Sequence, residues 1–258
     1  MQPSWHGSHT GRDDLKGAVV ACTQLLDTKS QDVNFQTRTD INRGNAYDQL
    51  GEPERAIADY VRALELDPRD AYAHRNKGVA RTRLGRLGEA MQEFAAAVEL
   101  KPDYAEAYGS RAEILRRMAP SSSESERAAL YQRALADYNK TISLGLGPRE
   151  AVAYKGRGFV NYYLAHLDAA IADFTNAIAL STEPSLLMAR AIAYADTGDF
   201  TRATADIEKA STIASNAGIS AANAAGITPA ALQSVRDYTV GHLRRFVGQR
   251  SCRGRDAS

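Results

Sequence analysis

The chain has 258 residues, of which 44% are hydrophobic and 24% are charged, and its formal net charge at pH 7 is +1. No apolar run approaches the roughly 18 residues of a membrane-spanning helix, which argues against a membrane protein. Because positive and negative charges nearly balance, the chain as a whole has no strong positive potential that would attract nucleic acid. The start lacks the basic-then-apolar order of a secretory signal. The sequence therefore predicts a cytoplasmic protein, or an exported one if a leader was removed or the start is misassigned.

The first predicted elements are a polar segment and one helix. Residues 1–12 are polar and are expected to be disordered, whereas the apolar spacing of Ala18–Leu26 predicts a half-repeat helix and loop within residues 13–36. On this helix, Cys22 is expected to be a buried small apolar side chain. Cys252 lies near the far end of the chain, so no intramolecular disulfide is expected.

A pattern of small, aromatic and turn-forming residues then recurs in five copies of about 34 residues each. In the first copy it is carried by Gly44, Tyr47, Leu50, Gly51, Ala56, Tyr60, Ala63 and Pro68. In the second it returns as Gly78, Leu84, Gly85, Ala90, Phe94, Ala97 and Pro102. The five copies span residues 37–70, 71–104, 105–148, 151–183 and 184–217. A fixed period of this length is typical of stacked helix pairs.

Each copy predicts two short antiparallel helices. Two amphipathic runs are separated by a glycine-containing break such as Leu84–Gly85, and a proline such as Pro68 ends the second run. Alanines such as Ala56 allow the helix axes to approach closely, and an aromatic residue such as Tyr60 fills the space between neighbours. No pair can bury its apolar face alone, so the copies must stack.

This spacing resembles the tetratricopeptide repeat family over roughly residues 37–217. The resemblance implies an all-α fold, a right-handed superhelical solenoid of antiparallel helix pairs whose first helices line a concave groove. Proteins of this kind are often bacterial, and binding another protein is their usual role.

Two regions depart from the period. The third copy carries ten extra residues between Met118 and Ala134. A capping box of Ser123 and Glu126 within them predicts a longer second helix and a projecting arm. The arm is either a tolerated surface insertion or a specific contact. Residues 218–247 predict a linker and a C-terminal capping helix from about Pro229, and residues 248–258 a basic disordered tail.

A base and an acid recur at two fixed positions of every copy, forming a charge ladder. The bases are Arg43, Lys77, Arg111, Arg157 and Arg190, and the acids are Asp59, Glu93, Asp137, Asp173 and Asp206. The bases either form an anion-binding track or pair with the acid of their own copy. Because an unpaired, partly buried charge is costly, we favour the structural pairing.

The sequence offers no catalytic constellation. The histidines lack metal-ligand spacing, and neither cysteine has a cysteine partner two residues away. Lys155–Gly158 contains a Gly-x-Gly, but within a predicted helix, where it indicates packing and not a phosphate loop. We therefore expect a non-enzymatic protein with no metal, no cofactor and no small-molecule substrate.

The family resemblance places first-helix side chains in the concave groove. The residues assigned to it are Asn45, Tyr72, Arg75, Asn76, Arg83, Arg116, Arg117, Lys155, Phe159, Tyr162, Tyr163 and Met188. Bases on copies two to four, beside an aromatic and apolar wall on copies four and five, favour a partner segment with acidic and apolar residues. Some relatives hold a chaperone's terminal carboxylate with a set that Asn45 and Asn76 match in part, but Ile41, Glu106 and Ser110 break that set.

These observations predict a non-catalytic adaptor that holds a peptide segment in the groove. The first alternative is a regulatory or assembly subunit of an enzyme or export complex, docking through its convex face, the arm at residues 119–133 or the cap. A third interpretation is an anionic membrane or nucleic-acid contact through the basic tail. Groove substitutions separate the first two, and salt-dependent binding of lipid or nucleic acid would favour the third.

Overall fold

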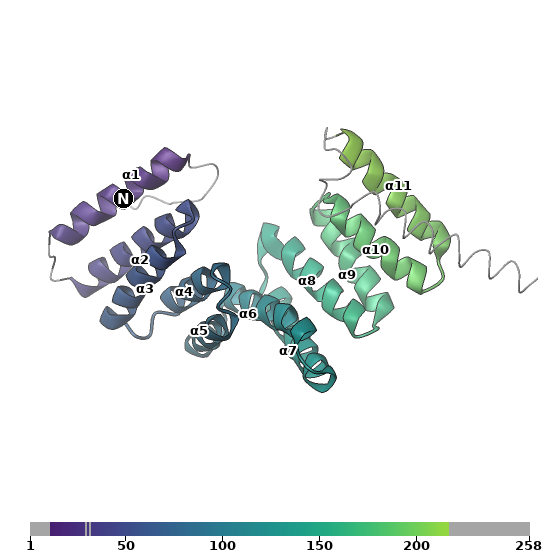
Figure 1. Cartoon of the computed structure of the whole chain (residues 1–258), viewed down its shortest axis with the longest axis horizontal. Coiled ribbons are helices and arrows are strands. Elements are labelled where there is room, and N and C mark those ends of the chain that lie inside the picture. Colours follow the sequence, from purple (N-terminus) through teal and green to yellow (C-terminus); the bar gives the residue numbers. More distant parts are fainter. Residues whose placement is uncertain (1–10, 29, 31, 217–258) are drawn as a thin grey trace, which may run out of the picture. The chain divides into compact units, whose positions relative to one another are not determined.

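The computed structural model describes residues 11–28, 30 and 32–216, and in these residues the fold is all-α (Figure 1). The chain divides into two compact units, Met1–Ser122 and Ser123–Ser258. In Figure 1 the first unit runs from purple to blue, and the second from teal to green. None of the helices in the described ranges is long and apolar enough to cross a membrane.

Among the described residues, unit 1 contains a single helix, two helix pairs and the first helix of the third copy. The helices are α1 (Arg12–Asp27), α2 (Val33–Leu50), α3 (Pro53–Leu66), α4 (Ala71–Arg83), α5 (Leu87–Leu100) and α6 (Ala105–Met118), with a short 3₁₀ turn η1 (Ala119–Ser121). Each helix packs against its successor, and α4 also contacts both α2 and α6. The first helices of consecutive copies therefore lie side by side.

Unit 2 continues the same arrangement. Its helices are α7 (Glu124–Leu144), α8 (Glu150–Tyr163), α9 (Leu167–Leu180), α10 (Pro184–Asp196) and α11 (Phe200–Asn216), with a 3₁₀ turn η2 (Gly147–Arg149) before α8. Successive helices again pack together, and α8 contacts α10.

The glycines of the repeat pattern lie against its aromatic residues. A Cβ atom on Gly44 would come within 2.7 Å of the Tyr60 ring, and one on Gly78 within 2.7 Å of the Phe94 ring. Both rings are almost completely buried, at 1% exposed. Because no real Cβ comes this close to a ring, glycine sets the separation of the two helices of a repeat.

The turn between the two helices of a copy uses a left-handed residue. Gly51, Gly85 and Gly198 have φ angles of 82°, 73° and 85°, and Ala165 occupies the corresponding place in the fourth copy at φ 60°. Left-handed backbone is open to glycine without steric cost but strains a residue that has a Cβ. The fourth copy therefore holds a strained turn.

The start of α2 and the burial of Cys22 differ from expectation, whereas the long α7 agrees with it. α2 begins at Val33, ahead of the expected start at residue 37, because Asp32 caps it by accepting a hydrogen bond from the Phe35 N–H at 3.2 Å. Cys22 was expected to be buried but is only half-buried on α1. α7 has 21 residues against 14 in α5, and Glu126 accepts hydrogen bonds from both the backbone and the hydroxyl of Ser123.

The predicted capping helix from about Pro229, its linker, the basic tail and residues 1–10 lie outside the described residues.

Candidate functional site

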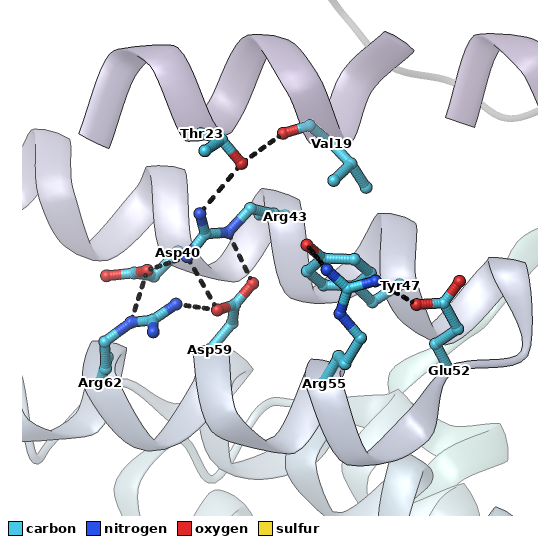
Figure 2. A network of polar contacts seen from close by, with 9 residues as sticks. All are labelled: Val19, Thr23, Asp40, Arg43, Tyr47, Glu52, Arg55, Asp59 and Arg62. Atoms are coloured by element: carbon cyan, nitrogen blue, oxygen red, sulfur yellow. Dashed lines mark hydrogen bonds and ion pairs between the residues drawn. The ribbon is translucent and has the colours of Figure 1, made fainter. Parts of the chain in front are cut away.

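We call the base and the acid of one copy a rung of the charge ladder. In the first rung an ion pair joins two helices, and a hydrogen bond from its arginine reaches a third (Figure 2). Arg43 on α2 donates to both carboxylate oxygens of Asp59 on α3, at 2.9 and 3.0 Å. Its remaining terminal nitrogen donates to the Thr23 hydroxyl on α1 at 3.1 Å. Asp40 and Arg62 complete the network, with Arg62 Nε donating to Asp40 at 3.2 Å. Burial raises the pKa of Asp40, against the opposing effect of these two arginines.

The fourth and fifth rungs repeat this geometry. Arg157 on α8 donates to Asp173 on α9 through two nitrogens, with a shortest distance of 2.6 Å, and Arg190 on α10 pairs with Asp206 on α11 at 2.7 Å. The third arginine nitrogen again contacts the preceding copy: Arg157 donates to Asn139 at 2.8 Å. The same nitrogen of Arg190 donates to the Thr175 hydroxyl at 2.9 Å. In these rungs one guanidinium joins three successive helices, which favours a structural role.

The second rung uses a lysine and gathers two further bases. Glu93 on α5 lies 3.0 Å from Lys77 and 2.6 Å from Arg81, and its other oxygen is 2.7 Å from Nδ1 of His74. Burial alone would raise the pKa of Glu93, but hydrogen bonds from His74 and Lys77 and the charge of Arg81 outweigh it and lower the pKa. The carboxylate therefore stays ionised in a largely buried place.

The third rung stays a prediction. Arg111 lies on α6 in unit 1, whereas Asp137 lies on α7 in unit 2 and is 6% exposed.

The predicted groove residues of unit 1 come from α2, α4 and α6, and we name their surface the first-helix face. Two side-chain amides of this face are hydrogen-bonded to each other across the boundary between two copies. Asn76 on α4 donates to Asn45 Oδ1 on α2 at 2.9 Å. The same oxygen accepts from the Tyr60 hydroxyl at 2.7 Å. Asn76 Oδ1 in turn accepts from Arg75 Nη1 at 3.1 Å. Asn45, Arg75 and Asn76 are half-buried, so the amides are fixed in place while remaining accessible.

Several of the predicted groove bases are neutralised within the chain. Arg83 on α4 lies 2.9 Å from Asp48 on α2. Arg116 on α6 donates to both oxygens of Glu113, one turn before it, at 2.9 and 2.7 Å. Lys155 in unit 2 donates to Glu183 at 2.7 Å.

Tyr72 is an exposed aromatic residue of this face. Its side chain is 48% exposed and its ring centroid lies 4.9 Å from that of buried Tyr104. The Lys101 ammonium lies over both rings, 4.5 Å and 5.3 Å from the two centroids. Burial raises the pKa of Tyr104 to about 12, against the opposing charge of Arg75.

The predicted aromatic wall of unit 2 is partly core. Met188 is 6% exposed and belongs to a cluster with buried neighbours of α10 and α11, so it contributes to packing instead of lining a surface. Phe159 is half-buried and packs edge-on against Phe174 at 5.2 Å. Tyr162 donates to Asp196 at 2.7 Å. Tyr163 remains 51% exposed and stacks on α7.

The remaining candidate, Arg117, is exposed at the end of α6. Lys101 and Tyr104 are parts of this surface that the sequence did not indicate, whereas Asp48 holds a groove position of the first copy. The sequence did contain a signal for Asp48, because it occupies the position of α2 that corresponds to Tyr162 of α8, and both reach the next first helix.

The Gly-x-Gly of α8 has a packing explanation. A Cβ on Gly156 would lie 2.3 Å from the Tyr138 ring, and one on Gly158 would lie 2.7 Å from the Phe174 ring. Across the described ranges, no group of histidine, cysteine, aspartate and glutamate side chains has an arrangement that could hold a metal ion.

Comparisons with known proteins agree on one repeat family. A tetratricopeptide repeat model matches residues 41–105, and no curated protein matches the chain. Among solved structures, the chain is similar to YrrB, a repeat protein described as having an unusual peptide-binding site, at 21% identity and a TM-score of 0.59, covering 74% of this chain and 91% of that one.

Two other repeat proteins are similar over most of their length. For TTC0263 of Thermus thermophilus the identity is 22% and the TM-score 0.55, covering 80% of this chain and 99% of that one. For MamA the identity is 25% and the TM-score 0.53, covering 66% and 90%. Its recurring pattern, its stacked helix pairs and these comparisons show that the chain has a tetratricopeptide repeat fold, with the family model matching residues 41–105.

Proposed function

We propose that the chain is a non-catalytic adaptor that binds an extended segment of another protein on the first-helix face of unit 1. The observation that carries this proposal is the amide pair of Asn45 and Asn76, hydrogen-bonded across two consecutive repeats at 2.9 Å. Its half-buried position holds both side chains in a single arrangement, which lowers the entropy lost on binding.

An extended peptide suits this arrangement chemically. Each residue of such a segment offers a backbone N–H and a backbone C=O, which must find new partners when they leave water. Within the described residues, Asn45 Nδ2 donates no hydrogen bond, so it is available to a peptide carbonyl. Tyr72, 48% exposed on the same face, offers an apolar ring with a polar tip beside the amides.

The family supports the same conclusion. Tetratricopeptide repeats serve mainly as protein-binding modules, and YrrB, which has a similar fold, is described as having a peptide-binding site. We infer that the bound segment combines acidic and apolar residues. The face presents Arg75 for the acid and the 48% exposed ring of Tyr72 for the apolar side chain.

The test is selection of peptides from a random displayed library on the full chain, followed by affinity measurements on the selected peptides. We expect Tyr72→Ala and Asn76→Ala each to weaken binding by about tenfold, because each loses a contact of about 1–2 kcal/mol. Gln92→Ala and Gln132→Ala, exposed on second helices α5 and α7, are matched controls and should change affinity less than twofold. The far-ultraviolet circular dichroism of all four variants should match the parent.

Two outcomes would reject this function. Selected peptides whose affinity is unaffected by both face substitutions would place binding elsewhere on the chain. Peptides whose binding is lost in the Gln132→Ala variant would favour the alternative of docking through the extended helix α7.

A further inference from the structure

One half-buried arginine of the first-helix face, Arg75, has no acid partner among the described residues. Arg83 is paired with Asp48 and Arg116 with Glu113, so the charges of these arginines are largely compensated inside the chain. Arg75 differs from both. Among the described residues, no carboxylate lies within ion-pair distance of its guanidinium, and its single hydrogen bond goes from Nη1 to the amide oxygen of Asn76 at 3.1 Å.

The unsatisfied part of Arg75 is buried. Its Nε is shielded from solvent and has no hydrogen-bond partner, although the residue as a whole is half-buried. The charge of Arg75 acts on three surrounding groups. It lowers the pKa values of Asp48, Tyr60 and Tyr104, whereas burial, the larger effect, raises them. Asp48 lies 2.9 Å from Arg83, and among the described residues its carboxylate is not within ion-pair distance of Arg75.

Guanidinium chemistry indicates what would complete this site. Arginine carries five N–H donors in a rigid fork, and a buried donor without an acceptor costs stability. A carboxylate can accept two parallel hydrogen bonds from that fork, one of them from Nε, and supplies the missing charge. Neutral acceptors would satisfy the donors but leave the charge uncompensated.

We propose that Arg75 is the specificity-determining residue of the first-helix face and binds the side-chain carboxylate of an aspartate or glutamate within the partner segment. This inference rests on the proposed function. Arg75 lies on the middle helix of the three that form the face, next to the Asn45–Asn76 pair. An extended segment that follows the face therefore continues on both sides of Arg75, so the carboxylate belongs to a side chain and not to the end of the chain.

The test is a double-mutant cycle between the full-length protein and a selected peptide that is acetylated at its N-terminus and amidated at its C-terminus. We expect selected peptides to be enriched in aspartate or glutamate. Replacing the critical acid by its amide should weaken binding about tenfold or more, as should Arg75→Gln, because a charge-assisted hydrogen bond is lost. The two changes together should cost no more than either alone. Arg75→Lys, which keeps the charge but loses the fork, should fall between.

Arg86→Gln is the matched control, because Arg86 is an exposed arginine at the start of the second helix α5 and lies outside the face, and we expect an effect below twofold. Circular dichroism and melting temperature verify the fold of each variant, and Arg75→Lys carries the test if Arg75→Gln does not fold.

The results that would overturn the inference differ from those that would overturn the proposed function. Peptides that respond to Tyr72→Ala but show no coupling between their acid and Arg75 would overturn the inference alone. Peptides that bind only with a free C-terminal carboxylate would overturn the side-chain assignment. Absence of any binding peptide would count against the proposed function itself.

Discussion

Replacing Arg157 by alanine is expected to destabilise unit 2 by about 3 kcal/mol, at the low end of the cost of breaking a buried ion pair. Asp173 is only 2% exposed, and without Arg157 its carboxylate keeps the Asn161 amide as a donor at 2.8 Å but loses its countercharge. Asp173→Ala should cost less, about 2 kcal/mol, because the Arg157 side chain is 22% exposed and can turn to solvent. The double variant should cost about 3 kcal/mol instead of the additive value of about 5, a coupling of about 2 kcal/mol.

The measurement is urea unfolding followed by circular dichroism on the parent, both single variants and the double variant. Lys155→Ala, on the same helix, is a matched control: its ion pair with Glu183 is 37% and 51% exposed, so a loss below about 1 kcal/mol is expected. Additive single effects would refute the structural role of the ladder. So would an Arg157→Ala variant that keeps its stability but loses peptide binding, because the arginine would then act on the partner.

Three further predictions concern single residues. Ala165→Gly should raise the free energy of unfolding by about 1 kcal/mol in a denaturant melt, because it relieves left-handed strain at φ 60°, and a loss of stability would refute that strain. Gly78→Ala should cost about 2 kcal/mol or more, because the new methyl would lie 2.7 Å from the Phe94 ring, whereas Gly88→Ala, with nothing within 4 Å, should cost nothing measurable. The lowered pKa of Glu93 means that this carboxylate contributes stability above about pH 4.5 that is lost as the pH falls through its folded value. Glu93→Gln should therefore flatten the acid side of the stability curve, and an unchanged slope would contradict this assignment.

Much of the fold is visible in the sequence because the repeat positions have simple steric roles. Gly44 and Tyr60 predict a close helix contact from their sizes alone, and the structure places them in contact. The extended second helix was also predictable, because the capping box of Ser123 and Glu126 is local. Ala165 was harder to interpret, since only its alignment with the turn glycines shows that it must adopt a left-handed conformation.

The candidate site was harder to predict from the sequence, because it depends on which side chains of different copies come into contact. The sequence alone does not show that Arg83 is paired. The packing of α2 beside α4 brings Asp48 close enough to neutralise its charge. Arg116 and Glu113 are one turn apart, so that pair could have been expected from spacing. Met188 has a groove position in the repeat but is buried at the α10–α11 contact, which the repeat position alone does not reveal. The isolation of Arg75 emerges only when the partners of all its neighbours are known.

Binding at the first-helix face is tested most directly by backbone amide chemical-shift mapping of the full-length protein with a selected peptide. We expect the largest shifts to cluster on α2 and α4, around Asn45, Tyr72 and Arg75, with smaller shifts on α6. Shifts confined to the exposed first turns of α7, or to residues outside α2, α4 and α6, would contradict binding at this face.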